Sequence, residues 1–239
     1  MENPQYAILR FAKYKGPEIS RIEAHDERTK ETYASNPDVD TTRSHLNYHL
    51  IQPQNHYRIE AERQIADAGC RTRSDSVRLV ETLITGSPEF FQEKTEKQIK
   101  AYFQHALAFL QERQRPDTFI SAVVHMDEKT PHMHMTFVPL TEDNRLTAKE
   151  IIGNRKKLTQ WQDEYSYLAT LIAAAQAAAE DFCRRSFAEN MPEPVRLAIY
   201  LYVGFMYTYR ENASQDAYRS MKQAFDALLW PHRDPTKIL

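Results

Sequence analysis

Three of the nine histidines in this chain fall within ten positions, in the stretch HMDEKTPHMH at residues 125–134. His132 and His134 are two residues apart, so in a strand both imidazoles point to one face while Met133 points to the other. If a strand that ends at His125 pairs with them across the intervening loop, a third imidazole reaches the same point. Three histidines suit a divalent transition metal and leave coordination positions open for substrate or water. The spacing therefore predicts a metal site.

Two acids, Asp127 and Glu128, lie in the same loop. We expect them to orient the histidines by accepting hydrogen bonds from the ring nitrogens that do not face the metal. On the residues alone a second interpretation stays open, in which one histidine is a buried polar residue and the others lie on a surface loop. The third histidine, the two acids and Pro131 favour the metal site.

The elements that would position these histidines follow from the hydrophobic pattern. Residues 118–125 and 132–139 have the composition of strands, and we expect them to form an antiparallel hairpin. Further strands are expected over 6–14, 44–51 and 77–85, and helices over 17–33, 56–68, 89–114 and from 154 onward. This order predicts an α+β fold, with helices packed on one sheet.

The composition changes near residue 165, where an alanine-rich stretch begins. We therefore expect a first domain over 1–165 and an all-helical segment of unknown role over 166–239. The uncharged stretch 197–209 is shorter than the ~20 apolar residues that a membrane-spanning helix needs. We expect it to be a buried helix.

Charge and cysteine content restrict the function classes. A formal net charge of −2 gives no general signal for nucleic-acid binding. One local basic patch could bind phosphates, although a solvated helix face explains it equally well; it comprises Arg145, Lys149, Arg155, Lys156 and Lys157. The only cysteines are Cys70 and Cys183, and they predict neither a disulfide framework nor a cysteine zinc site. The N-terminal residues do not resemble a secretion signal, so we expect a cytoplasmic protein.

Three stretches in order resemble the motifs of the Mob/Pre family of plasmid mobilisation relaxases, within the HUH (His-hydrophobic-His) endonuclease superfamily. HDER at 25–28 resembles the first motif, which is usually His-Asn-x-Arg, and the stretch 36–48, from Asn36-Pro to RSHLNY, resembles the second. HMDEKTPHMH at 125–134 resembles the metal motif. The similarity extends over roughly residues 6–163 and implies a relaxase fold with an antiparallel sheet.

The resemblance implies the chemistry of the site. His125, His132 and His134 would bind Mn²⁺ or Mg²⁺ and polarise a phosphate of single-stranded origin-of-transfer DNA. A protein nucleophile would then attack phosphorus, expel a 3′-hydroxyl and form a covalent 5′-phosphoryl intermediate that can later be rejoined. The implied partner is plasmid origin DNA. The conjugation machinery and a second copy of the chain are further partners that the resemblance leaves open.

The nucleophile implied by this branch of the superfamily is the histidine of the first motif, which is His25. A neutral imidazole is nucleophilic near pH 7, and Arg28 could hold the phosphate by a bidentate contact. Glu128 is a third candidate catalytic residue. Asp26 departs from the usual asparagine, and an acid beside a phosphate repels it unless a cation intervenes. On chemistry alone Tyr14, Tyr33 and Tyr48 also stay open as nucleophiles.

The second motif supplies Arg43, His45 and Asn47 as candidate DNA-binding residues, together with the basic patch. Two other functions are compatible with the sequence. The first is a DNA-binding regulator that keeps the fold without catalysis. Asp26 and the unusual C-terminal segment are the features that favour it. The second is a His₃ metalloenzyme of the cupin type, but such proteins are mostly strand with many glycine turns, whereas this chain has 5 glycines and abundant helix.

Overall fold

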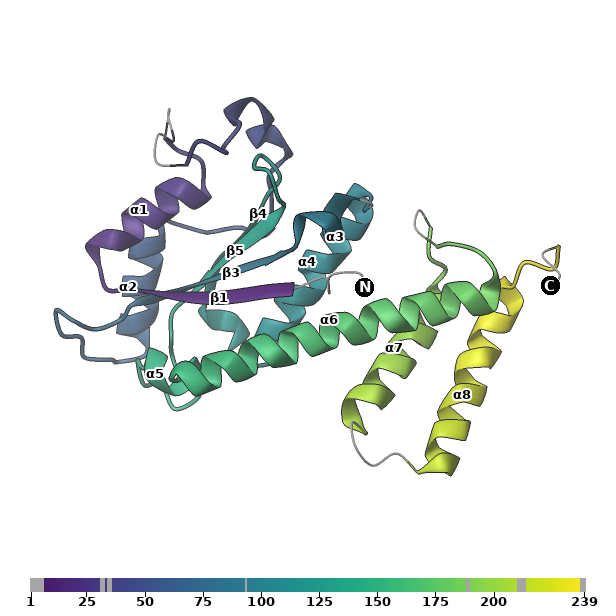
Figure 1. Ribbon diagram of the computed structural model, residues 1–239. Helices are drawn as coiled ribbons and strands as arrows, with labels where there is room; N and C mark the ends of the chain where they lie inside the picture. The colour runs from purple at the N-terminus through teal and green to yellow at the C-terminus, as the bar shows by residue number, and fades with distance from the viewer. Residues whose placement is uncertain are drawn as a thin grey trace. The chain divides into compact units, whose positions relative to one another are not determined.

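A five-stranded antiparallel sheet is the framework of the first part of the chain (Figure 1). The computed structural model describes residues 7–30, 33, 36–92, 94–187, 190–209 and 214–236. The chain divides into two units, residues 1–163 and residues 164–239. Helix α6 (Arg155–Cys183) begins in the first unit and ends in the second.

The strands lie in the order β1-β3-β5-β4-β2, and every pair is antiparallel. Their bounds are β1 (Ala7–Tyr14), β2 (Tyr48–Ile51), β3 (Leu79–Gly86), β4 (Phe119–His125) and β5 (His132–Phe137). Every residue of β4 is buried, as expected for an apolar strand in the interior of a sheet. The predicted β4–β5 hairpin is confirmed, and its register sets His125 opposite His132.

Helices cover both faces of the sheet. We call the face that carries His132 and His134 the histidine face, and the face that carries Met133 and Met135 the methionine face. On the histidine face, α1 (Pro17–Asp26) and α2 (Tyr57–Asp67) bury Ile19, Tyr57 and Ile65 against Leu79 and Ile120. In Figure 1 these two helices lie together on one side of the sheet.

The methionine face is covered by α4 (Glu96–Gln111) and the first turns of α6. Phe11 of β1 lies on this face, and its ring packs edge-on against Trp161, with centroids 5.3 Å apart. Trp161 in turn packs against Phe109 of α4. The side chain of Gln162 then bonds the outer backbone edge of β1, because its Nε2 donates to the Ala7 carbonyl and its Oε1 accepts from the Leu9 N–H. An edge strand with free backbone groups is thereby partly paired.

Several elements differ from those predicted. Residues 41–46 form a 3₁₀ helix, η1 (Thr41–Leu46), so the strand predicted over 44–51 begins only at Tyr48. The helix predicted over 89–114 is two helices, α3 (Pro88–Gln92) and α4, because Thr95 caps α4 in a reciprocal capping box with Gln98. The short helices α5 (Ala148–Ile151) and η2 (Pro116–Thr118) were not predicted.

The helix predicted over 17–33 ends at Asp26. Arg28 adopts a left-handed backbone conformation, with φ of 52°, and the Thr29 N–H bonds the Ala24 carbonyl at 3.2 Å. Such a turn closes a helix and redirects the chain. Of the remaining residues in that prediction, 31 and 32 lie outside the described residues, as does Tyr6 of the predicted first strand.

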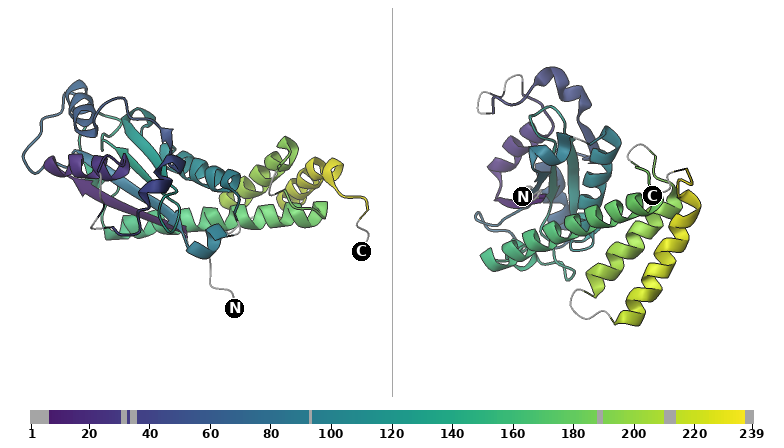
Figure 2. Two further views of the ribbon diagram at one scale, coloured as in Figure 1. Left: turned by 90° about the horizontal axis from the view of Figure 1, so that it is seen from above. Right: turned by 45° about the vertical axis from the view of Figure 1, so that its right-hand side comes forward.

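The second unit consists of the rest of α6 with α7 (Glu193–Thr208), α8 (Gln215–Leu229) and η3 (Trp230–His232), shown from two further sides in Figure 2. Its core contains the small residues Ala175 and Ala179 of α6 and the aromatic ring of Phe225. The stretch 197–209, expected to be buried, is amphipathic instead: Leu197 is 48 % exposed, whereas Val203 is buried. No helix among the described residues has the length and apolar character to cross a membrane.

Candidate active site

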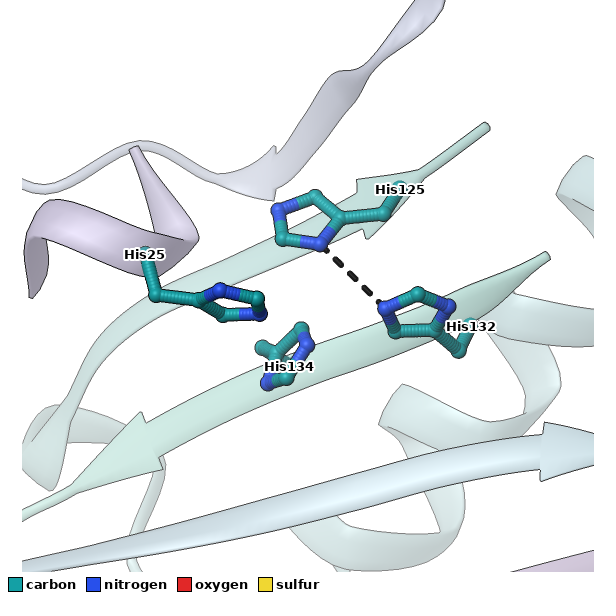
Figure 3. A group of neighbouring side chains, drawn as sticks. All are labelled: His25, His125, His132 and His134. Carbon is teal, nitrogen blue, oxygen red and sulfur yellow. Dashed lines mark hydrogen bonds between the residues drawn. The ribbon is translucent and has the colours of Figure 1, made fainter. Parts of the chain in front are cut away.

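Four histidines from two strands and one helix meet above the histidine face. One ring nitrogen from each of His25, His125, His132 and His134 lies within 4.8 Å of the others. His125 ends β4, His132 and His134 lie on β5, and His25 comes from the last turn of α1 (Figure 3). The predicted hairpin therefore brings the three histidines of HMDEKTPHMH together, and α1 adds the fourth.

Each of the three hairpin histidines has one ring nitrogen bonded to a protein acceptor. His125 Nε2 lies 2.8 Å from the Asp26 carbonyl, and His132 Nδ1 lies 2.9 Å from the Thr130 carbonyl. His134 Nδ1 lies 2.6 Å from Glu81 Oε1. Because a carbonyl or carboxylate oxygen only accepts, these nitrogens carry the protons, and the opposite nitrogens keep their lone pairs.

The nitrogens with lone pairs face a common centre. His125 Nδ1 and His132 Nε2 are 3.3 Å apart, the contact drawn as a dashed line in Figure 3. His134 Nε2 is buried without a hydrogen-bond partner among the described residues. A buried, unpaired nitrogen beside two converging ones is what a metal ion would complete. The three histidines thus fit a divalent transition metal such as Mn²⁺ by position and by tautomer.

Burial keeps these rings neutral. It lowers the pKa of His125, and the neighbouring His134 and Arg28 lower it further. Burial also places the pKa of His134 well below its usual value. The pKa of His25 is lowered too, by burial first and then by the positive charge of Arg28. Neutral imidazole is the form that binds a metal or acts as a nucleophile, so both roles are available near pH 7.

Glu81 of β3 is a site residue that the sequence interpretation missed. It is buried, and its second carboxylate oxygen accepts a 2.7 Å hydrogen bond from the hydroxyl of Tyr14. The Asp26 side chain is also buried, 3.5 Å from His134 Nδ1, and neither of its oxygens has a hydrogen-bond partner among the described residues. Burial and the charge of Glu81 raise the pKa of Asp26 well above its usual value. Two carboxyl groups thus lie on the outer side of one imidazole.

Arg28 connects the first motif to the hairpin loop. Its Nε and Nη2 donate to Asp127 at 2.9 Å, and Nη2 also donates to Glu128 Oε1 at 2.6 Å. Its Nη1 donates to the His25 carbonyl and lies 3.3 Å from His25 Nδ1. The Arg28 guanidinium therefore donates to protein groups, and its bidentate contact with a phosphate stays a prediction. Asp127 and Glu128 likewise hold Arg28, whereas other acceptors orient the histidines.

Glu128 also faces the histidine centre. Its Oε1 lies 3.6 Å from His132 Nε2 and 4.0 Å from His125 Nδ1. Its Oε2 accepts a 3.1 Å hydrogen bond from Asn36, a residue of the second motif. The pKa of Glu128 is lowered: burial alone would raise it, but His132, Asn36 and Arg28 outweigh that effect. An ionised carboxylate therefore lies at the edge of the centre.

The remaining second-motif residues support the hairpin loop. Asn47 Oδ1 accepts the Met126 N–H at 2.7 Å, and Ser44 donates to Asp127 at 2.6 Å. The exposed Arg43 donates to the Met126 carbonyl, and His45, also exposed, lies 3.0 Å from the Thr42 carbonyl through Nδ1. Arg43 and His45 are therefore placed beside the centre with exposed surface, whereas the Asn47 amide oxygen is used inside the protein.

The predicted basic patch lies at the other end of the sheet. The Gln114 side chain donates to the Leu140 carbonyl beyond the end of β5, and Val138 pairs with Thr118 before the start of β4. The hairpin's six residues of β5 separate this end from His132, roughly 20 Å at the usual strand rise. Figure 1 shows α5 there, away from the loop that joins β4 and β5.

Several patch charges already have partners. Arg145 pairs with both Asp143 and Glu150, and Lys157 donates to the Glu150 carbonyl. Lys149, Arg155 and Lys156 are exposed. The patch therefore offers fewer free cations than its composition suggests, and none beside the histidines.

The tyrosines considered as nucleophiles are poorly placed. Tyr14 donates its hydroxyl to Glu81, and Tyr33 donates to the Ala24 carbonyl at 3.4 Å. Tyr48 pairs in register with Val124, so it projects from the methionine face, and burial raises its pKa to about 12. His25 is the nucleophile candidate that faces the metal candidates, with its ring 5.1 Å from that of His134.

The family model of plasmid recombination enzymes, Mob_Pre, matches residues 3–174. The chain belongs to this family. A type 3 plasmid recombination enzyme of Staphylococcus aureus is 38 % identical over 166 residues, which are 67 % of this chain and 40 % of that relative. A plasmid recombination enzyme of Lactiplantibacillus plantarum is 37 % identical over 66 % of this chain and 45 % of its own length. The chain thus matches less than half the length of these curated Mob/Pre relatives.

The fold is also similar to solved structures of a relaxase domain. The MobM relaxase domain, bound to Mn and to origin-of-transfer DNA of plasmid pMV158, superposes with a TM-score of 0.61. It is 28 % identical, and the match covers 67 % of this chain and 86 % of the MobM chain. A second MobM complex covers 91 % of this chain at 22 % identity and a TM-score of 0.57, which shows the fold alone. The sheet and helices of residues 7–163 are therefore a Mob/Pre relaxase fold.

Proposed function

We propose that this protein is a plasmid mobilisation relaxase, which cuts one strand of origin-of-transfer DNA at a specific site and later rejoins it. The observation that carries the proposal is the division of four histidines into two groups. Three have their outer nitrogens held by protein acceptors and their inner nitrogens directed to one centre, while His25 approaches from a separate helix. Phosphodiester transfer can be catalysed by a metal ion with a neutral nucleophile beside it.

His125, His132 and His134 would hold the ion, and Mn²⁺, which the MobM domain binds, suits them. Mg²⁺ is the alternative, although imidazole ligands favour the transition metal. When bound, the ion would stabilise the negative charge that develops on the phosphoryl oxygens during the reaction. Glu128 lies where its carboxylate could bind the same ion or a water molecule on it.

His25 would attack phosphorus with a ring nitrogen. In Figure 3 the tip of its ring points toward the other three histidines. A nitrogen–phosphorus bond forms as the bond from phosphorus to the 3′-oxygen breaks. The imidazole, which becomes cationic when it attacks, releases the proton of its other ring nitrogen to water, and the departing oxygen takes a proton from water to become a 3′-hydroxyl. The energy of the phosphodiester stays in the new bond, so the reverse attack by a 3′-hydroxyl rejoins the strand. Burial, and after it the positive charge of Arg28, lowers the pKa of His25, and the neutral ring keeps the lone pair that attacks phosphorus.

The DNA contacts divide into two groups under this proposal. Arg43 and His45 lie beside the centre and would contact the strand near the cut, while Asn47 supports the loop that carries the ligands. Lys149, Arg155 and Lys156, with Arg145 and Lys157 beside them, would contact DNA farther from the cut. Residues 1–165 would form the DNA-processing domain. Plasmid DNA lies in the cytoplasm of a bacterium, and we propose the same location for the protein.

A nicking assay tests the proposal. Purified protein with Mn²⁺ should convert supercoiled plasmid that carries the cognate origin into open circles, and should leave a plasmid without that origin supercoiled. His25→Ala should abolish nicking while DNA binding persists. If the wild-type protein binds the origin but does not cut it in the presence of any divalent metal, the protein is a DNA-binding regulator and the proposal fails.

A further inference from the structure

Arg10 of β1 is an exposed arginine without a partner among the described residues. It makes no hydrogen bond or ion pair with any of the described residues, and its neighbours Ala7 and Leu9 on the same strand are buried. An unpaired arginine on a strand edge is often only a solvated surface charge. Its place in the sheet distinguishes this one.

The register aligns Arg10 with the metal-binding histidines. Arg10 pairs with Leu83 of β3, and Leu83 pairs with His134 of β5. Residues directly opposite in an antiparallel sheet point to the same face, so Arg10 lies on the histidine face in one row with His134. Two strand spacings separate the row's ends, about 10 Å between Cα atoms. That span is one that neighbouring phosphates of an extended strand of DNA can bridge.

The sheet between them is not fully covered. Along the histidine face of β3, Leu79 and Glu81 are buried, but Leu83 and Thr85 are partly exposed. The helices α1 and α2 therefore cover this face at the rows of Leu79 and Glu81 and leave the row of Leu83 accessible. On the methionine face the neighbouring Ile84 and Thr82 are buried. The exposed row leads from the four histidines to Arg10.

We propose that this row, with Leu83 as its floor and Arg10 at its end, binds the single-stranded DNA segment adjacent to the cleaved phosphate. The proposal rests on the proposed function, because it takes the DNA strand at the histidines as its starting point. Arg10 contributes a planar, permanently charged group that holds a phosphate through two parallel hydrogen bonds. Unlike Arg28, whose donors all face protein groups, it is free to do so.

Lys13 supplies a matched control. It lies on the same strand, is exposed and carries the same charge, but it pairs with Val80 and so projects from the methionine face. Neither residue touches the histidine centre. Substitution of either one to alanine removes one positive charge from β1, and only the face differs.

The experiment measures binding of a fluorescently labelled oligothymidylate and of a labelled origin strand by anisotropy, over a series of salt concentrations. Arg10→Ala should weaken binding about three- to tenfold and lower the salt slope by about 0.7, as expected for one lost phosphate contact on a single strand. Lys13→Ala should bind as the wild-type protein does. Mn²⁺ affinity, measured by calorimetry, should be unchanged in both variants.

Three outcomes would overturn the proposal. If Arg10→Ala binds like the wild-type protein, DNA does not follow this row, and the proposed function is untouched. If Lys13→Ala loses as much affinity as Arg10→Ala, the effect is general charge and the row has no role. If the wild-type protein binds neither strand, both the row and the relaxase proposal fail. Arg10→Lys, which keeps the charge but loses the bidentate geometry, should recover part of the affinity.

Discussion

The two ends of the β4–β5 hairpin use their polar residues differently. At one end His125, His134 and the acids Asp26 and Glu81 are buried, and several of their atoms lack partners among the described residues. At the other end Arg145, Asp143 and Glu150 are exposed and pair with one another. Exposed ion pairs cost little and contribute little. Buried, unpaired polar atoms are costly, and a fold that retains them does so where a ligand or a reaction completes them.

Removal of a metal-binding histidine should have the largest effect. His134→Ala should lower Mn²⁺ affinity by more than about a hundredfold, the upper limit for residues that only orient a ligand, and nicking should be lost with it. Calorimetric titration of Mn²⁺ measures this. His232→Ala, in the second unit, is the control and should bind Mn²⁺ normally. Equal loss in both variants would contradict the assignment of the site.

The two doubly paired arginines give the most direct comparison of the ends. Arg28→Ala leaves the ionised Asp127 and Glu128 without their partner in a largely buried setting, and should lower the free energy of unfolding by about 3 kcal/mol. Arg145→Ala also breaks two ion pairs, but these are exposed to solvent, so the free energy of unfolding should not change. Urea unfolding of the two variants measures both. If the two variants have similar free energies of unfolding, burial does not make the Arg28 ion pairs more important for stability than the exposed Arg145 pairs.

Glu81 should have a moderate effect, and on the metal rather than on the fold. Glu81→Gln keeps the volume but weakens the acceptor that orients His134, so Mn²⁺ affinity should fall by roughly tenfold. Tyr14→Phe, which removes only the hydrogen bond to Glu81, should have a smaller effect in the same direction. Calorimetry on both variants tests the order. Unchanged Mn²⁺ affinity in Glu81→Gln would show that the contact does not tune the ligand.

The sequence predicts the convergence of the hairpin histidines better than it predicts what surrounds them. Alternation in the strand places His132 and His134 on one face, and the hairpin loop is short enough to bring in His125. Glu81 pairs with a residue far along the chain, and its only signal is an acid within an otherwise apolar strand. The left-handed turn at Arg28 has no signal at all, since a non-glycine residue rarely adopts it. At that turn the Arg28 side chain reaches Asp127 and Glu128.

The basic patch should show the smallest effect. Replacement of Lys149 and Lys156 by alanine removes two exposed charges far from the histidines, and should weaken DNA binding only a few-fold and equally for all sequences. The rate of nicking at saturating DNA should not change. Anisotropy and nicking kinetics measured on one preparation separate the two quantities. A loss of nicking rate at saturation would mean that this end of the sheet takes part in the reaction.

The central claim is that the four histidines divide into three metal ligands and one nucleophile. Mass spectrometry of the DNA-linked peptide, after cleavage of an origin strand in Mn²⁺ and digestion with a protease, tests it directly. We predict a single modified peptide, with the 5′-phosphoryl group on His25, and normal Mn²⁺ affinity in His25→Ala. DNA attached to a tyrosine, or loss of Mn²⁺ binding in His25→Ala, would contradict it.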